Sequence, residues 1–333
     1  MHLREAARLP WPVSAVGLGT WQLGADWGNV DDSQAVQILS TAAESGVRLF
    51  DTADVYGDGR SEQTIGRFLA GRSVSSPADD RIQVFTKMGR RVEQLEANYV
   101  LENFRAWNDR SRVNLGVDTI DLVQLHCPPD EVFASDAVFG ALDTLVEEGR
   151  ITRYGVSVET CDQALLAMAR PNVASVQIIL NAFRQKPLEQ VLPVAADAGV
   201  AIIARVPLAS GLLSGRFDHD TTFAPDDHRN YNRSGAAFDV GETFAGVPYD
   251  DGVEAAKAFS AIAAEAGLSP VQLALRWVLD QPGVTTVIPG ASSVAQVEAN
   301  VAADALSPLD EATLEAVRDL YDERIRPLVH ARW

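Results

Sequence analysis

Short apolar runs with the character of β-strands alternate along the chain with amphipathic helical patterns. This alternation is typical of repeated βα units, in which helices join parallel strands. The strand-like runs are, in order, AVGLG, VRLF, IQVFT, IDLVQL, TRYGVS, ASVQIIL, VAIIARV and TTVI. Eight such runs in succession favour an α/β fold of the closed (β/α)8 type, the TIM barrel, over an open sheet.

The helical patterns between the runs have recognisable ends. Asp31 or Asp32 is a candidate N-cap for the first helix, and Gly149 is placed to end another. We expect helices over about residues 31–45, 61–70, 92–112, 134–148 and 294–303. A hairpin over about residues 5–16 precedes the first unit. Because no linker interrupts the pattern, we expect residues 1–333 to form a single domain.

One connection departs from this rhythm. The segment 207–251, after the seventh strand-like run, shows little helical or strand periodicity and is rich in Gly, Asp, Asn and aromatic residues. Loops of this length inside compact domains are usually functional or disordered. We expect residues 217–249 to form a mobile lid over the C-terminal face of the barrel, with a disordered insertion as the alternative.

The charge balance narrows the set of partners. The net charge is −18, from 28 Lys and Arg against 46 Asp and Glu. Nucleic-acid backbones and anionic membranes both attract clustered basic residues, so we expect neither as a partner. No apolar stretch approaches the ~20 residues of a membrane span, and MHLREAARLP lacks the apolar core of a secretory signal. With two cysteines expected as reduced thiols, Cys127 and Cys161, we expect a cytoplasmic protein. The oligomeric state stays open.

Four candidate catalytic residues lie at or just beyond the ends of strand-like runs. Asp51, Lys87 and His126 directly follow VRLF, IQVFT and IDLVQL, and Tyr56 lies in the loop after Asp51. The C-terminal ends of barrel strands meet at the face that carries active sites in this architecture. The sequence therefore predicts that the four side chains share one site.

Their chemistry suits proton transfer to a carbonyl oxygen. An unperturbed tyrosine has a pKa near ~10, and a neighbouring cation such as Lys87 lowers it. Asp51 would hold that ammonium in place, and His126 would donate a hydrogen bond to the carbonyl oxygen. Side chains do not supply hydride, so a nicotinamide cofactor is required. We expect no metal. Taken singly, the Tyr could be a loop aromatic, the Asp a turn cap and the His a core residue.

Seven segments, in order, resemble those of the aldo-keto reductases: GLGTWQLG (17–24), FDTADVYGDGRSEQTIG (50–66), TKMG (86–89), QLHCPP (124–129), RYGVS (153–157), PLASGLLSG (207–215) and VIPGASSVAQVEAN (287–300). The resemblance runs from about Leu9 to the end of the chain. It implies NAD(P)-dependent reduction of an aldehyde or ketone, sugar-like compounds included, or the reverse oxidation. Tyr56 would be the general acid or base.

The resemblance also implies where the cofactor lies. A strand followed by G-x-G-x-x-G and a helix is missing, so the dinucleotide would lie extended across the barrel top rather than on a Rossmann fold. Ser157 and Gln177 match positions that bond the nicotinamide carboxamide, and Arg205 stands where an aromatic ring often stacks on it. Val158 replaces a common Asn. The other implied cofactor contacts are Gly19, Thr20, Trp21, Asp51, Pro207, Leu208, Ser210, Gly211, Leu212, Gly290, Ser292, Gln296 and Asn300.

The adenosine end departs from the family pattern. Ser292 stands where an Arg that binds the 2′-phosphate is frequent, although a helix N-terminus still attracts phosphate. We expect NADP on the family pattern, with NAD as the alternative. Trp21, Tyr56 and His126 would contact the substrate, with Trp27 as a further wall of the pocket.

Two other functions remain open at this point. Lys87 could form an imine with substrate, as in barrel aldolases, which would make the protein a Schiff-base lyase. The fold is also shared by potassium-channel β-subunits, so a cofactor-sensing regulatory subunit is the second alternative.

Overall fold

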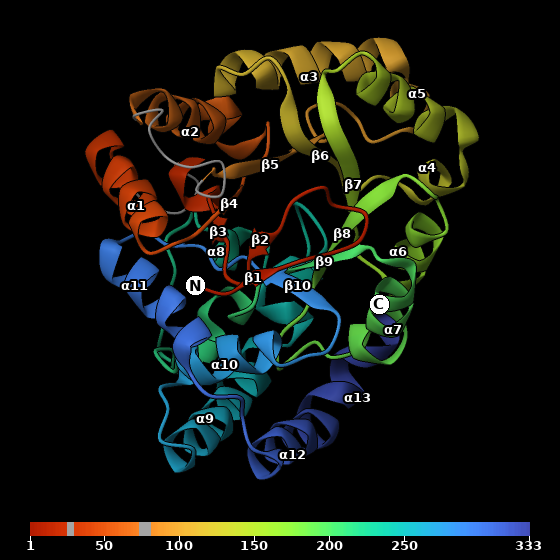
Figure 1. Ribbon diagram of the computed structural model, residues 1–333. Coiled ribbons are helices and arrows are strands. Elements are labelled where there is room, and N and C mark those ends of the chain that lie inside the picture. Colours follow the sequence, from red (N-terminus) through yellow and green to blue (C-terminus); the bar gives the residue numbers. More distant parts are fainter. Residues whose placement is uncertain (25–29, 73–80) are drawn as a thin grey trace.

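Eight parallel strands form a barrel in the computed structural model, which describes residues 1–24, 30–72 and 81–333. Helices surround the strands, and Figure 1 views the barrel from the side of the N-terminal hairpin. The expectation for Trp27 lies outside the described residues. The barrel strands are β3 (Leu18–Gly19), β4 (Leu49–Asp51), β5 (Gln83–Met88), β6 (Ile120–His126), β7 (Ile151–Ser157), β8 (Val173–Ile179), β9 (Ala201–Arg205) and β10 (Val284–Val287).

The strands follow one another in sequence order, from β3 to β10. Two parallel bridges, Val16 with Val287 and Gly19 with Gly290, join the two ends of this sheet. The Gly19 amide donates to the Pro289 carbonyl at 3.1 Å. A Cβ on Gly19 would lie 2.9 Å from the Ile288 carbonyl oxygen, so closure at this point requires glycine. The expected (β/α)8 barrel is confirmed.

The main helices lie outside the strands: α1 (Asp32–Glu44), α2 (Arg60–Gly71), α3 (Leu101–Leu115), α4 (Asp130–Ala134), α5 (Asp136–Glu147), α6 (Cys161–Met168), α7 (Pro187–Ala198), α9 (Tyr249–Glu265), α10 (Pro270–Leu279), α11 (Val294–Ala302), α12 (Glu311–Leu320) and α13 (Arg326–Val329). Asp31 caps α1 by accepting from the Gln34 amide at 2.8 Å, as expected.

One helix prediction is wrong in its bounds. The helix expected over 92–112 begins at Leu101, because the preceding stretch crosses the strand ends instead. There, the Gln94 side-chain amide donates through Nε2 to the carbonyls of His126 and Cys127 at 3.1 and 2.9 Å. The helix expected over about 134–148 is α5, to within two residues, and the extended backbone of Ser135 (ψ 109°) separates it from the short helix α4.

The N-terminal hairpin closes one end of the barrel. Strand β1 (Leu3–Arg4) pairs with β2 (Val13–Ser14) in antiparallel register. Leu9 and Val13 belong to one buried cluster with side chains inside the barrel: Leu49, Phe85, Leu122, Ala174, Ala201, Ile203 and Ile288. Burying this apolar surface stabilises the closed end by roughly 25 cal/mol per Å².

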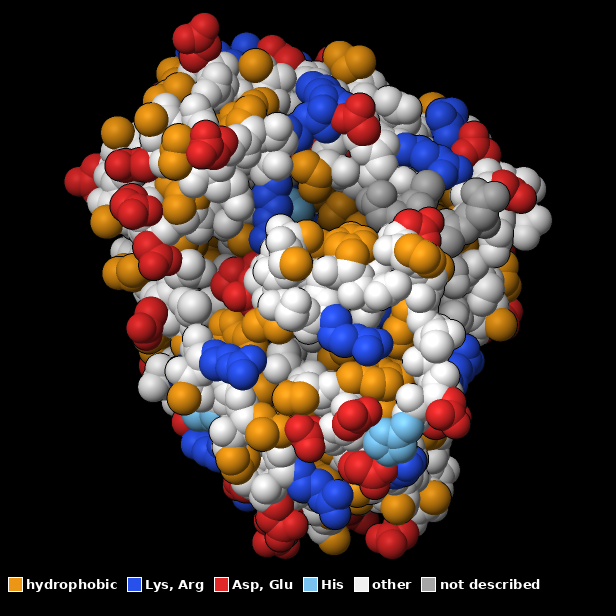
Figure 2. All heavy atoms as spheres, turned by 180° about the vertical axis from the view of Figure 1, so that it is seen from behind, with side chains coloured by type: hydrophobic (Ala, Val, Ile, Leu, Met, Phe, Trp, Pro, Cys, Tyr) orange, Lys and Arg blue, Asp and Glu red, His pale blue; other side chains and the backbone are white. Residues whose placement is uncertain are grey.

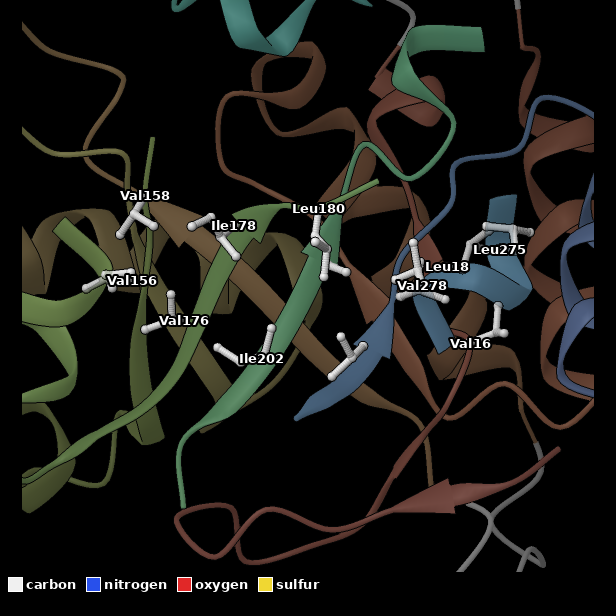
Figure 3. Packing of buried hydrophobic residues seen from close by; sticks show 14 of the residues in the cluster. Val16, Leu18, Val156, Val158, Val176, Ile178, Leu180, Ile202, Leu275 and Val278 are labelled. Atoms are coloured by element: carbon white, nitrogen blue, oxygen red, sulfur yellow. The ribbon is translucent and has the colours of Figure 1, made fainter. Parts of the chain in front are cut away.

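The outward side chains of the same strands form the main core. Figure 3 shows Val156, Val176, Ile178 and Ile202 on neighbouring strands, within the cluster that includes Leu275 and Val278 of α10. Strand alternation explains the division, because successive side chains point to opposite faces.

The long segment after β9 lies against the barrel. It contains the short helix α8 (His228–Tyr231) and 3₁₀ turns at Ala209–Ser214, Val240–Glu242 and Phe244–Gly246. Among the described residues, no single helix is long and apolar enough to cross a membrane. Helices α9 and α10 meet such a criterion only together, and they are bent by 84° at their junction.

Candidate active site

The four predicted catalytic side chains meet at the C-terminal end of the strands. The Lys87 ammonium donates to Asp51 Oδ1 at 2.5 Å and to the Thr52 carbonyl at 2.9 Å. It also lies 3.5 Å from the Tyr56 hydroxyl. The Tyr56 and His126 rings meet edge to face, with centroids 6.1 Å apart. The lysine therefore bridges the carboxylate and the phenol, as the sequence predicts.

A tight turn fixes the Tyr56 ring. Tyr56 begins a 3₁₀ turn (Tyr56–Gly59) in which Gly57 has φ +57°. A Cβ on Gly57 would lie 2.0 Å from the Gly24 carbonyl oxygen. The two loops thus pack backbone to backbone, which only glycine permits. This contact brings Trp21 onto Tyr56, with ring centroids 5.8 Å apart and planes 16° apart.

Burial sets the protonation states of the site. It raises the pKa of Tyr56 above its ordinary value, and the Lys87 charge opposes this shift without reversing it. The net direction is opposite to the one expected from Lys87 alone. Burial would lower the pKa of Lys87, but Asp51 and Tyr56 outweigh it and the net shift is upward. Burial and the nearby cations hold the pKa of His126 well below its usual range. The site thus presents a protonated phenol, an ammonium and a neutral imidazole.

The raised pKa of Lys87 bears on the imine alternative. An amine attacks a carbonyl only when it is neutral, and imine-forming lysines are activated by a lowered pKa. Lys87 is instead 1% exposed and ion-paired. Its surroundings therefore disfavour a Schiff-base reaction.

Two glutamines complete the floor of the site. Gln177 donates to Asp51 Oδ2 at 2.7 Å, and Gln124, a residue not predicted, lies 3.4 Å from the same oxygen. Ser157 lies 3.4 Å from the Cys127 thiol. Gln177 and Ser157 are both 1% exposed and lie opposite each other on β8 and β7. The predicted carboxamide-binding pair is thus at the mouth, with its side chains bonded to protein neighbours.

The Arg205 guanidinium, which was expected to stack on the nicotinamide ring, belongs to a cluster of ion pairs. Its guanidinium donates to the Val158 carbonyl at 2.9 Å and to Glu159 at 3.0 Å, and it lies 2.6 Å from Glu242. Arg90 pairs with the other Glu159 oxygen at 3.1 Å. Burial acts against ionisation of Glu159, but the two arginines outweigh it and lower its pKa to about 2.

A Cys127 sulfur and two carboxylates in this cluster lie within 4.8 Å of one another, a spacing that a metal ion could bridge. Guanidinium groups already engage both carboxylates, from Glu159 and Glu242.

Aromatic side chains form a wall beside Tyr56. Trp21 has its ring centroid 5.1 Å from that of His228 and 6.1 Å from that of Phe238, both in the long segment. Figure 2, from the side opposite the hairpin, shows a hollow where basic and hydrophobic side chains and a histidine gather. The segment expected to be a lid therefore contacts the site; its mobility stays a prediction.

The remaining predicted cofactor residues form the rim. Thr20 donates to the Asp51 carbonyl through both its hydroxyl and its amide, at 2.8 and 2.9 Å. After β9, Ala209, Ser210 and Gly211 have positive φ, in the turn that also includes Pro207, Leu208 and Leu212. The Ser210 hydroxyl donates to the Glu242 carbonyl at 3.0 Å. This turn ties the long segment to the strand end.

The residues predicted to bind the adenosine end of the cofactor bond to one another. Gln296 accepts from the Ser292 amide at 2.6 Å, and Asn300 donates to the Gly290 carbonyl at 3.2 Å. An adjacent groove of about 440 Å³ separates the starts of α1 and α11 and is lined by Asp31, Ser33, Gln34, Gln37, Ser293, Val294 and Ala295. Of the described residues that line it, one carries a carboxylate and none carries a cation.

This donor set fits a dinucleotide. The mouth offers a hydroxyl and an amide at the nicotinamide positions, a turn with positive φ, and serine hydroxyls at the N-terminus of α11, where phosphate is favoured. Sequence reasoning missed Gln124, Asp54, Glu159, Glu242, His228 and Phe238 as site residues. Gln124 and Asp54 lie inside quoted motifs, and Glu159 follows the end of β7 by two residues. Glu242, His228 and Phe238 come from the long segment, where no periodicity marked them.

Comparisons with known proteins identify the family to which the chain is similar. A family model described as the Aldo/keto reductase family matches residues 15–322. The uncharacterized oxidoreductase Rv2298 of Mycobacterium tuberculosis (strain H37Rv) is 33% identical over 299 residues, 87% of this chain and 84% of that one. A probable voltage-gated potassium channel subunit beta of Oryza sativa subsp. japonica is 28% identical over 328 residues, 93% of each chain.

Among solved structures, the glycerol dehydrogenase AKR11B4 from Gluconobacter oxydans has a TM-score of 0.77 and 29% sequence identity, covering 97% of this chain and 96% of that one. An aldo-keto reductase from Klebsiella pneumoniae in complex with NADPH has a TM-score of 0.70 at 24% identity, covering 96% of both.

Proposed function

The chain belongs to the aldo/keto reductase family and is an NAD(P)-dependent oxidoreductase, and from that premise we propose that Tyr56 is its general acid and base. In carbonyl reduction the bound reduced nicotinamide supplies hydride to the carbonyl carbon. Tyr56 gives its proton to the oxygen, which yields the alcohol and a phenolate that solvent reprotonates. The reverse oxidation uses the phenolate as base.

The observation that carries this proposal is the position of Lys87 between Asp51, at 2.5 Å, and the Tyr56 hydroxyl, at 3.5 Å. The ammonium stabilises the phenolate that forms when the proton leaves. His126, kept neutral by its lowered pKa, donates a hydrogen bond that directs the carbonyl oxygen toward Tyr56. Trp21 supplies the wall against which the substrate lies.

For the cofactor we propose NADP, with NAD as the alternative. Support comes from the family pattern and from the similar Klebsiella pneumoniae reductase, which was solved with NADPH. Ser157, Gln177 and Arg205 would hold the nicotinamide end. The uncharged Ser292 and the acidic groove beside it bear on the alternative, since an NAD site needs no cation for a 2′-phosphate.

For the substrate we propose a hydroxylated aldehyde or ketone of sugar or polyol type. The wall of Trp21, Phe238 and His228 combines aromatic faces with a hydrogen-bonding imidazole, a pairing that suits C–H faces and hydroxyl groups. The similar Gluconobacter oxydans protein is a glycerol dehydrogenase.

A regulatory role is the second candidate, because the chain is similar to a probable potassium channel subunit. A bound dinucleotide would then be sensed rather than turned over rapidly. Co-purification of a membrane channel, with turnover too slow to matter, would favour it.

We also propose a cytoplasmic location, since Cys127 and Cys161 are both free thiols and are buried. Cell fractionation with an antibody to the protein tests it.

The test of the proposed reaction is a panel of aldehydes, ketones and alcohols run with NADPH, NADH and their oxidised forms. We expect turnover of hydroxylated aldehydes, and faster alcohol oxidation as the pH rises, because the raised pKa of Tyr56 makes the base form scarce at neutrality. The absence of any cofactor-dependent turnover across the panel would contradict the reductase assignment of these residues.

A further inference from the structure

Trp333 fills a slot far along the chain from the catalytic residues. The side chain is 6% exposed. Its ring packs face-on against Arg184, whose Cζ is 3.6 Å from the ring centroid, and its indole N–H donates to Asp239 at 3.2 Å. A Cβ on Gly246 would lie 2.1 Å from the ring, and one on Gly241 would lie 3.0 Å from it. The slot therefore has the shape of this indole.

The slot joins three separate parts of the chain. Asp239, Gly241 and Gly246 belong to the long segment between β9 and α9. Arg184, which follows β8, is 2% exposed and donates to the Glu159 carbonyl at 2.6 Å. Since Glu159 pairs with Arg205, the indole is linked through Arg184 to the ion cluster at the barrel mouth.

One route leads from the indole to the ion cluster at the barrel mouth, and a second leads to the substrate wall. Glu242, three residues after Asp239, is ion-paired to Arg205 at 2.6 Å. On the other side, Asn232 donates to the Asp239 carbonyl at 3.4 Å and accepts from the Phe238 amide at 3.0 Å. Asn232 is fully buried.

Phe238 in turn lies against Trp21, with ring centroids 6.1 Å apart, and Trp21 stacks on Tyr56. A continuous series of contacts thus runs from Trp333 to the substrate side of the catalytic tyrosine.

We propose that Trp333 is a positioning residue that anchors the long segment and so fixes the substrate wall of Phe238 and His228. The expected effect of Trp333 on turnover rests on the proposed role of Tyr56, whereas its anchoring of the segment does not. The indole touches none of Asp51, Lys87 or His126, which lie on β4 to β6. Loss of the indole leaves the proton donor in place and releases the wall.

The test compares Trp333→Ala and Trp333→Phe with the parent enzyme, using DL-glyceraldehyde and NADPH as probes. For Trp333→Ala we expect a rise in KM of about ten-fold or more, the scale set by losing a few apolar contacts. The kcat value should stay within about three-fold, since the proton donor is unmoved. Trp333→Phe keeps the ring against Arg184 and should recover most of the loss. Trp107→Ala on α3, the same truncation far from the segment, is the matched control and should leave KM unchanged.

Hydrogen exchange gives a readout that needs no turnover. In the substrate-free protein, Trp333→Ala should speed amide exchange across residues 228–247 and leave β4 to β6 unchanged. If Trp333→Ala does not fold, Trp333→Phe removes the indole N–H that is donated to Asp239 while keeping a ring against Arg184, and it should give the same exchange pattern at smaller amplitude.

Equal exchange in parent and variant overturns the proposal, as does a fall in kcat at constant KM. An inactive parent enzyme would contradict the proposed function, and the exchange comparison would still decide the role of Trp333.

Discussion

The two ends of the barrel interior are built from the same strands and have opposite chemistry. Toward the hairpin, Leu49, Phe85 and Ile203 pack in a dry apolar cluster. Two residues further along the same three strands stand Asp51, Lys87 and Arg205, all buried and all ion-paired. Residues two apart on a strand point to the same face. Each of these strands therefore places one apolar and one polar side chain in the barrel interior, in two successive layers.

The two layers separate the residues that stabilise the fold from those that are candidates for catalysis. Apolar burial stabilises in proportion to area. Buried ion pairs often contribute little net stability, because desolvation offsets their attraction. The polar layer is therefore better explained by catalysis than by folding, and substitutions at the two ends should give opposite results.

Tyr56→Phe is the largest expected effect at the mouth. General-acid loss should lower kcat by ~10²–10⁴-fold. Dinucleotide affinity and the unfolding midpoint should stay close to the parent values, since the hydroxyl's hydrogen bond within the described part of the chain is the long one from Lys87, at 3.5 Å. Steady-state kinetics and cofactor titration measure the two. Tyr154→Phe, which removes a hydroxyl bonded to Asp143 on the outer face, is the control. Retention of more than about half of kcat, against that expected range, would remove Tyr56 from the acid role.

Leu122→Ala should give the reverse result at the closed end. Leu122 is fully buried in the hairpin cluster, and truncation should cost roughly 2–5 kcal/mol of unfolding free energy. The kcat of the folded enzyme should change less than about three-fold, because the polar layer is untouched. Urea unfolding followed by tryptophan fluorescence measures the first quantity. A large loss of kcat without a loss of stability would mean that the two layers are not separable.

Ser292→Arg tests the rim of the site, outside both layers. We expect it to leave the unfolding free energy and kcat unchanged and to alter cofactor preference. A new charge-assisted contact to a 2′-phosphate is worth roughly 1.5–3 kcal/mol, or about ten-fold or more in affinity for NADPH over NADH. Fluorescence titration of both reduced cofactors measures the ratio. An unchanged ratio would place the 2′-phosphate away from the start of α11.

Asp54→Asn is the smallest expected effect, and it concerns stability at the mouth. Asp54 is 1% exposed, and neither carboxyl oxygen has a hydrogen-bond partner in the described structure. Burial, and then the charge of Glu62, raise its pKa from 3.8 to about 7. The folded protein binds this proton more tightly than the unfolded chain does. The associated stability is thus fully present below about pH 4 and is lost as pH rises toward 7.

Asparagine has no proton to lose, so the variant should gain on the parent by about 2 kcal/mol between about pH 5.5 and pH 8. Urea unfolding at the two pH values measures this gain. A constant difference between variant and parent would show that Asp54 titrates normally.

Some parts of the fold and of the site could be predicted from the sequence and others could not. The catalytic tetrad could be predicted because short apolar runs mark the strand ends, and one face of the barrel collects the residues at and just beyond those ends. The start of α3 could not, because Gln94 bonds carbonyls of His126 and Cys127 and diverts the chain. Glu242 could not be found either, since its pairing with Arg205 is set by how the long segment folds back. Local pattern predicts elements and the residues at their ends, whereas tertiary ion pairs between distant segments leave no periodic trace.

The hairpin that plugs the apolar end has a kinetic consequence. Among the described residues it closes that end, so reductant, carbonyl compound, alcohol and spent cofactor share the entrance at the mouth. Molecules that share an entrance obstruct one another's departure. Where the departure of the last of them is the slowest step, it sets the ceiling on turnover, and a faster proton donor would not raise that ceiling.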